Sequence, residues 1–152
     1  MVNGWHLDLD AGDDAAYAAL ARDAIWNGYG IADLVLPYRQ YTRVGVAQRD
    51  GEVATCVILR HSAFTSLIPA GDTVGLGSLL AALELPVRTY ITVRDDLVEE
   101  IDRWYDFGGS AHRMLRMVVT AAAFIPDAGA DLPERLTTSD LPDLQAFYAD
   151  YD

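Results

Sequence analysis

The sequence predicts an α/β domain with a mixed, largely antiparallel sheet flanked by helices. Runs rich in β-branched residues alternate with helical patterns along residues 1–125, which is typical of strands and helices layered around one sheet. Two of these runs flank Asp50-Gly51, a dipeptide that favours a type I′ hairpin turn and therefore an antiparallel pair. The 152 residues are 51% hydrophobic and 22% charged, a length and composition that can bury the core of one domain.

Two helices are expected before the first strand. The first should begin near Asp13 or Asp14, because either carboxylate can cap a helix. Residues at the spacing i, i+3, i+4, i+7 and i+8 would form its apolar face: Tyr17, Leu20, Ala21, Ala24 and Ile25. Glycines interrupt this pattern, and a short second helix is expected over residues 31–36, before Pro37.

The hairpin should join strands within residues 41–49 and 52–60. The second strand is apolar on both of its alternating faces, with Val53, Val57 and Leu59 on one and Ala54, Cys56 and Ile58 on the other. A strand of this kind lies inside a sheet that is covered on both sides. Residues 63–68, AFTSLI, predict a third strand.

A helix, a strand, a helix and a strand complete the expected domain. Asp72 can cap the first of these, whose leucines recur on one face: Leu76, Leu79, Leu80 and Leu83. Residues 86–93, PVRTYITV, alternate clearly and predict the strand. Asp96 with Glu99 resembles a capping box for the next helix, which Gly108-Gly109 should end and whose apolar stripe is Leu97, Ile101, Trp104 and Tyr105. Residues 112–120 predict the last strand.

The C-terminal part reads as the beginning of a second domain. Residues 126–133, PDAGADLP, have no periodicity and predict a linker after a first domain that spans residues 1–125. Residues 134–137 predict a short strand, and Ser139 or Asp140 should cap a helix with Pro142 in its first turn. Residues 134–152 would then be the first strand and helix of an incomplete domain.

The charge argues against some partners. Acidic residues outnumber basic ones 23 to 11, for a net charge of −12, and no basic stripe offsets them, so nucleic-acid binding is not expected. The acidity is read either as a solvated surface or as attraction for a cationic amine. Because no apolar run is long enough for a membrane span and the N-terminus lacks a signal-peptide pattern, no membrane partner is expected and the location should be cytoplasmic.

One segment has the spacing of a phosphate-binding loop. Asp72 to Ser78, DTVGLGS, places Gly75 and Gly77 at a helix start, where backbone amides can approach a pyrophosphate. The spacing resembles the Gln/Arg-x-x-Gly-x-Gly/Ala loop with which acetyltransferases hold coenzyme A. Asp72, however, stands where that loop has Gln or Arg, and a carboxylate repels pyrophosphate. We therefore expect an ordinary helix start whose small residues allow close packing.

The other candidate residues do not form a recognisable catalytic, cofactor or metal site. His6, His61 and His112 show none of the usual metal spacings, although the fold could bring them together. Cys56 is expected to be a buried hydrophobe, and a Cys56–His61 nucleophile pair would need a sharp turn after Arg60.

Two further features have alternative interpretations. Arg116 shares a predicted strand face with His112, Met114 and Val118, and it either pairs with an acidic residue or anchors an anionic ligand. An aromatic segment follows the first helix and is expected to serve the core or an interface rather than line a ligand pocket: Trp26, Tyr29, Tyr38 and Tyr41.

The C-terminal stretch PERLTTSDLPDLQAFYADY resembles the first strand, cap and first helix of the Gcn5-related N-acetyltransferase (GNAT) fold. The hairpin YTRVGVAQRDGEVATCVIL, followed by PVRTYITV and HRMLRMVV, is similar to the degenerate GNAT-like accessory domain that precedes the catalytic half in a group of GNAT proteins. The resemblance implies transfer of acetyl from acetyl-CoA to a small-molecule or peptide amine. It also implies that a bulge and a backbone splay hold the thioester, and that the catalytic parts lie downstream of Asp152.

On this interpretation the chain alone should neither bind acetyl-CoA nor catalyse transfer. A C-terminal helix without the rest of its sheet would leave Leu144, Phe147 and Tyr148 poorly covered, so a homodimer is expected. Two alternatives remain open: a complete, non-enzymatic ligand-binding or protein-interaction module with a degenerate GNAT-like fold, and a self-contained acyltransferase that uses Asp72 to Ser78 as its cofactor loop.

Overall fold

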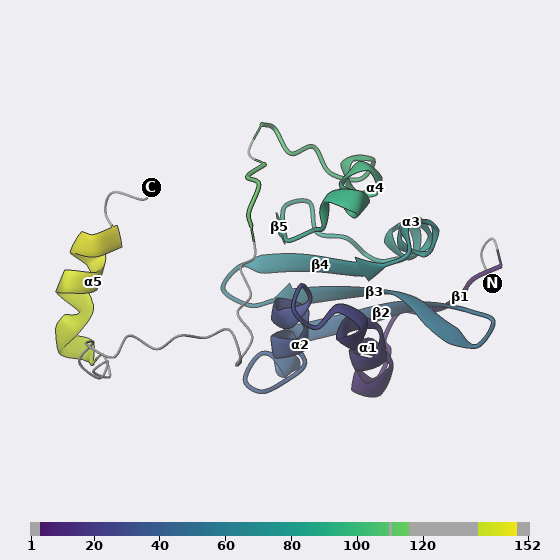
Figure 1. The fold of residues 1–152 in the computed structure, drawn as a ribbon, viewed down its shortest axis with the longest axis horizontal. Coiled ribbons are helices and arrows are strands. Elements are labelled where there is room, and N and C mark those ends of the chain that lie inside the picture. Colours follow the sequence, from purple (N-terminus) through teal and green to yellow (C-terminus); the bar gives the residue numbers. More distant parts are fainter. Residues whose placement is uncertain (1–3, 110, 116–136, 149–152) are drawn as a thin grey trace, which may run out of the picture. The chain divides into compact units, whose positions relative to one another are not determined.

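A computed structural model describes residues 4–109, 111–115 and 137–148. The chain separates into two compact units, Met1–Arg116 and Met117–Asp152. In the first unit, five strands form one sheet in the order β1-β2-β3-β4-β5, antiparallel except for the parallel β4–β5 pair (Figure 1). The strands are β1 (His6–Asp8), β2 (Thr42–Arg49), β3 (Glu52–His61), β4 (Thr65–Gly71) and β5 (Tyr90–Ile91). The mixed, mostly antiparallel α/β sheet predicted from the sequence is therefore confirmed.

The β2–β3 hairpin has the predicted two-residue turn. Arg49 pairs with Glu52, and the φ angles of Asp50 and Gly51 are 54° and 84°. Positive φ at both central residues is what a type I′ turn requires, and Asn, Asp and Gly adopt it at least strain.

A β-bulge changes the alternation predicted for β3. Ala47 opposes Thr55 while Gln48 opposes Val53, which leaves Ala54 as the extra residue. Val53 consequently packs on the same side as Cys56, and Ala54 packs on the side of Val57. The predicted placement of Val53 with Val57 is thus wrong, because the bulge shifts the side-chain alternation by one residue.

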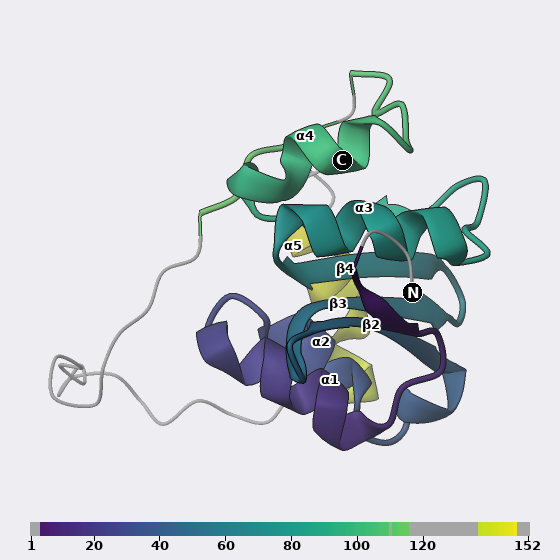
Figure 2. The same cartoon turned by 90° about the vertical axis from the view of Figure 1, so that its right-hand side faces the viewer.

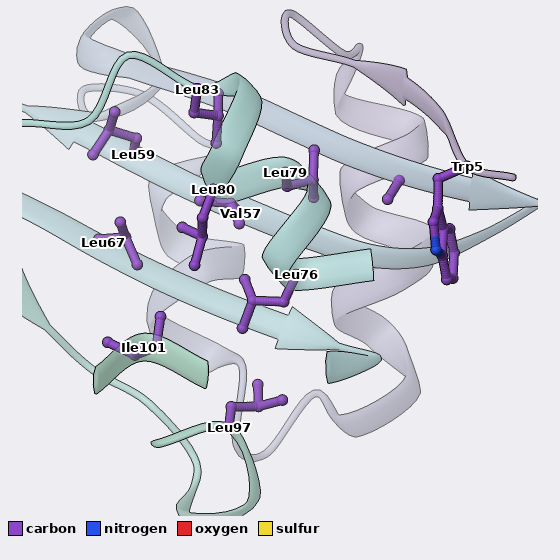
Figure 3. Close-up of a cluster of buried hydrophobic side chains, with 11 residues drawn as sticks. Trp5, Val57, Leu59, Leu67, Leu76, Leu79, Leu80, Leu83, Leu97 and Ile101 are labelled. Atoms are coloured by element: carbon purple, nitrogen blue, oxygen red, sulfur yellow. The ribbon is translucent and has the colours of Figure 1, made fainter. Parts of the chain in front are cut away.

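Both faces of the sheet are covered, as the apolar β3 pattern predicted. Helices α3 (Thr73–Ala82) and α4 (Val98–Asp102) lie over one face, and α1 (Asp13–Leu20) and α2 (Gly28–Asp33) lie over the other (Figures 1 and 2). Figure 3 shows the core under α3, with Trp5 at one end. Its buried members are Trp5, Ala47, Val57, Leu59, Leu67, Leu76, Leu79, Leu80, Leu83, Leu97 and Ile101.

Helix α1 begins where it was predicted but buries a different face. Gly12, not an aspartate, is the N-cap, and the Asp13 carboxylate pairs with Arg39 instead. The buried residues are Ala16, Ala19 and Leu20, whereas Tyr17 and Ile25 are exposed. A 3₁₀ turn, η1 (Ala21–Asp23), follows Leu20 and breaks the 3.6-residue period on which the predicted face depended. A second 3₁₀ turn, η2 (Arg39–Tyr41), leads into β2.

The predicted strand over residues 86–93 shortens to the two residues of β5. Its neighbour β4 explains this, because the Leu67 carbonyl accepts from Thr92 N–H at 3.1 Å and so points toward β5. Two residues further along the same edge stands Pro69, which has no N–H to donate. Pairing therefore ends after Leu67↔Ile91. In the other direction β4 begins at Thr65, so residues 86–88 have no strand residue opposite them, and Val87 is exposed.

Helix α3 confirms its predicted cap and leucine face, whereas α4 departs from prediction. The 3₁₀ turn η3 (Asp95–Leu97) precedes α4, whose N-cap is Leu97, and Asp96 pairs with Arg94 rather than capping. Leu97 and Ile101 are buried as predicted, but Trp104 is 41% exposed. Residues 112–115 are not in a strand, and residues 116–120 lie outside the described part.

The described part of the second unit is a 3₁₀ turn, η4 (Thr138–Asp140), and helix α5 (Leu141–Tyr148). Pro142 is in the first turn of α5, as predicted. The N-cap is Thr137 rather than Ser139 or Asp140. Asp140 belongs to the same capping box, and its Oδ2 accepts from the Thr137 N–H and hydroxyl at 2.6 and 2.9 Å. These bonds lower the pKa of Asp140. The predicted linker, and the predicted strand up to residue 136, lie outside the described residues.

Candidate functional site

The start of α3 has its backbone donors occupied by the protein itself. Asp72 is the N-cap, and its Oδ1 accepts from the amides of Val74 and Gly75 at 2.9 and 3.0 Å. These are donors that a pyrophosphate would need at this helix start. The Thr55 hydroxyl holds Asp72 in turn, donating to its carbonyl at 2.9 Å and accepting from its N–H at 3.1 Å.

The two glycines of this segment serve close packing. A Cβ at Gly75 would overlap the Thr55 hydroxyl and lie 3.3 Å from Trp5 Cη2. A Cβ at Gly77 would overlap only Oε1 of Glu100, the end of a flexible side chain. Gly75 therefore lets α3 approach β3 closely, which agrees with the packing interpretation of the sequence.

The groove beside α3 has an unsuitable charge for a phosphate ligand. A cavity of about 570 Å³ between α3 and α4 is lined by the carboxylates of Asp96, Glu99 and Glu100, with Arg103 as its cation. Arg103 already pairs with both glutamates, at 3.6 and 2.8 Å. The local field therefore repels a pyrophosphate.

His6 and His61 lie far apart, and Cys56 is not a reactive thiol. His6 pairs opposite Gln48 at one end of the hairpin, while His61 ends β3 eight residues beyond Val53. At about 3.3 Å per residue the two are roughly 25 Å apart. Cys56 is fully buried, and desolvation raises the pKa of its thiol to about 12, so it is not a thiolate nucleophile at neutral pH.

A buried ion pair on the other face of the sheet is the most unusual polar feature. Asp33, the last residue of α2, accepts from Nη1 of Arg60 on β3 at 2.7 Å. Their side chains are 3% and 15% exposed. Loss of water around Asp33 raises the pKa of its carboxyl, and the attraction of Arg60 offsets this only in part.

Aromatic rings surround this pair. The Arg60 guanidinium carbon lies 5.0 Å from the ring centroid of Tyr38 and 5.1 Å from that of Phe64. Phe64 in turn meets Tyr90 edge to face, with centroids 5.3 Å apart. The ion pair and the three rings border a cavity of about 550 Å³, here named the Asp33–Arg60 pocket. Its lining residues are Tyr29, Ala32, Asp33, Tyr38, Arg60, Phe64, Ser66, Ile68, Tyr90 and Thr92.

The Asp33–Arg60 pocket also gathers polar atoms that the protein leaves unpaired. In the described residues, four buried side-chain atoms have no hydrogen-bond partner in the protein: Asn27 Oδ1, Asp33 Oδ2, Arg60 Nε and Ser66 Oγ. Three of the four belong to residues that line this pocket. Folded proteins keep few such atoms, because each costs about 1–3 kcal/mol when it stays unpaired.

The sequence did not reveal this site. Tyr29 and Tyr38 line the pocket, Trp26 is half-buried and Tyr41 is 47% exposed, and the core or interface role expected for this aromatic segment stays a prediction. Arg116, the candidate anchor for an anionic ligand, lies outside the described residues. Asp33, Arg60 and Ser66 were missed, although a lone Asp in the apolar run IADLVL and an Arg ending VATCVILR are local signals of a buried pair.

Comparisons with known proteins identify no family. No family model matches the chain, and searches of curated proteins and of solved structures returned no match. Within the described residues, no group of three or more His, Cys, Asp or Glu side chains could hold a metal ion. Among the same residues, no helix has the length and apolar character that crossing a bilayer requires.

Proposed function

We propose that this chain is a GNAT-like accessory domain that supports acetyl transfer without holding acetyl-CoA itself. One observation carries the proposal: the Asp72 carboxylate occupies the amides of Val74 and Gly75, at the segment whose spacing resembles a coenzyme A loop. The transfer to a small-molecule or peptide amine would then belong to a separate catalytic domain. A cytoplasmic location and a homodimer are part of the same proposal.

The mixed, largely antiparallel sheet flanked by helices is the feature of the fold that supports the GNAT part of the proposal. The acidic groove next to α3 supports the other part, because it opposes a pyrophosphate at the place where the loop spacing would put one.

Calorimetric titration of the 152-residue chain with acetyl-CoA tests this proposal. We expect no saturable binding in the micromolar range for the wild type. The variant Asp72→Gln restores the Gln-x-x-Gly-x-Gly pattern and removes the carboxylate from the two amides, so any binding should appear there first. The variant Asp72→Asn is the matched control, because asparagine keeps the cap without the charge. Micromolar binding by the wild type would refute the proposal.

A second candidate function is a non-enzymatic ligand-binding module. The specific observation that favours it is the Asp33–Arg60 pocket, where three buried polar atoms have no partner in the protein. Concave sites with aromatic walls and a few convergent polar groups are the usual form of small-molecule sites. Ligand-detected NMR with a fragment set tests it, and the absence of any saturable ligand near Arg60 would count against it.

A further inference from the structure

We propose that the Asp33–Arg60 pocket binds an uncharged, planar group that carries a hydrogen-bond donor next to an acceptor, as a carboxamide does. This inference rests on the second proposed function, the ligand-binding module, and goes further by naming the class of ligand. It does not depend on whether the fold is related to the GNAT family.

The unpaired atoms of the pocket define what the ligand must offer. Asp33 Oδ2 is an acceptor and therefore needs a donor. Arg60 Nε is a donor and therefore needs an acceptor. The Ser66 hydroxyl can serve in either direction. A group that carries both a donor and an acceptor is thus the smallest that can satisfy both charged residues.

The charges of the pocket favour an uncharged ligand. Asp33 and Arg60 already neutralise each other through the 2.7 Å contact. An ammonium would satisfy Asp33 Oδ2 but would repel the Arg60 guanidinium and leave its Nε unpaired. A carboxylate would do the reverse, since it would repel Asp33 and leave Oδ2 without a donor. Only a group with both functions avoids an unpaired charge at low dielectric.

The walls of the pocket favour a flat ligand. The register pairs Arg60 with Ser66 and Ser66 with Tyr90, so these three residues lie side by side across β3, β4 and β5. Cross-strand partners share a face of the sheet, which places the serine between the guanidinium and the tyrosine ring. Aromatic and guanidinium planes both stack on flat groups.

The size and the rim of the pocket are compatible with entry of a small molecule. Its volume of about 550 Å³ is within the range usual for small-molecule sites. Phe64 and Tyr90 form part of its wall and are 49% and 71% exposed. Phe64 lies over the Arg60 guanidinium, 5.1 Å from its carbon, and exposed side chains change rotamer rapidly, so this ring can move aside.

A matched probe series tests the proposal in the full 152-residue chain at pH 7. Benzamide, benzoate and benzylamine share a ring and differ in the polar group: uncharged donor plus acceptor, anionic acceptor, and cationic donor. Titration followed by ¹H–¹⁵N NMR should show benzamide binding saturably, at least about fivefold more tightly than either charged probe. The largest shifts are expected at the amides of Arg60, Ser66 and Tyr90.

Variants identify the polar group that contacts the probe. Ser66→Ala removes one unpaired oxygen without breaking the ion pair, so the fold should persist while benzamide affinity falls about three- to tenfold. Ser78→Ala is the matched control, because Ser78 is also buried but lies on α3, where its hydroxyl bonds to the Val74 carbonyl. It should leave the affinity unchanged.

The outcomes separate this inference from the function on which it rests. Tighter binding of benzylamine or benzoate would overturn the ligand class but leave the ligand-binding module intact. Binding of none of the three probes would overturn both, and would mean that ordered water alone satisfies the pocket. Equal affinity in Ser66→Ala and the wild type, with no shift at the Arg60 amide, would show that benzamide binds outside the polar cluster, which also overturns the inference.

Discussion

Replacing each of the two glycines of α3 by alanine tests whether this helix start is shaped for packing. In the middle of a helix, Gly→Ala should stabilise the protein by about 0.5–1 kcal/mol, because glycine loses more backbone entropy on folding. At Gly77 the added methyl meets only the end of the Glu100 side chain, which can swing away. Displacing Glu100, whose side chain is 12% exposed, weakens its pair with Arg103 at a cost of about 0.5–1 kcal/mol. The unfolding free energy of Gly77→Ala should therefore be close to that of the wild type.

Gly75→Ala should behave in the opposite way. Its methyl would overlap the Thr55 hydroxyl, which belongs to a central strand and bonds twice to the backbone of Asp72. Overpacking of this kind costs about 1–3 kcal/mol, and loss of the Thr55 hydrogen bonds adds about 1 kcal/mol. After the helix-propensity gain, we expect a net loss of about 1–3 kcal/mol in the unfolding free energy.

Guanidinium chloride unfolding followed by far-UV circular dichroism measures both variants. Adding Thr55→Ala to Gly75→Ala should recover stability, because it removes the obstructing oxygen, and the double-mutant cycle should show a coupling of about 1 kcal/mol or more. If Gly75→Ala and Gly77→Ala unfold at the same denaturant concentration, Gly75 is not there for packing, and a role in approaching a ligand becomes the better explanation.

Three further outcomes are expected. Gly71→Ala should lower the unfolding free energy by about 3 kcal/mol or more, measured by chemical denaturation, because its φ of +106° is strained for alanine and a Cβ would overlap the Ala54 carbonyl oxygen. Cys56 should react with a thiol reagent at pH 8 only after denaturation, and because its folded pKa is raised to about 12, its contribution to stability should fall as pH rises above about 9. The raised pKa of Asp33 means that its ionisation removes stability as pH rises from about 4, so the unfolding free energy of Asp33→Asn minus that of the wild type should increase with pH.

The parts of the fold that the sequence predicted depend on local signals. Asp50-Gly51 specifies its turn through the φ angles it tolerates, and the leucines of α3 reveal their buried face through spacing alone. The predictions that were wrong concern features that depend on residues distant in the sequence. The bulge at Ala54 exists only in the pairing of β3 with β2, and β5 is short because its neighbour β4 begins at Thr65 and carries Pro69. No property of residues 86–93 themselves reports that proline.

The candidate site shows the same contrast between local signals, which the sequence reveals, and contacts between distant residues, which it does not. Asp72 was predicted as a helix cap from its own position, and its contacts confirm this. The Asp33–Arg60 pair joins residues 27 positions apart, and Ser66 reaches Arg60 only through strand register. Spacing rules cover motifs within one element, so a site assembled from a helix, a turn and three strands leaves no regular pattern in the sequence.

The two faces of the sheet differ in how the buried polar groups of the described residues are satisfied, and this difference is the reason for proposing a binding site on one of them. On the α3 face, the Thr55 hydroxyl and the Asp72 carboxylate each make two hydrogen bonds, so that region is complete as a structure. On the α2 face, a buried ion pair contacts through a single nitrogen and leaves atoms of both partners unpaired. Buried pairs of this kind are often no more stable than apolar replacements, so stability does not explain why Asp33 and Arg60 stand there. Local rules are broken mainly at functional sites, and the α2 face, rather than the start of α3, is therefore where this domain should recognise another molecule.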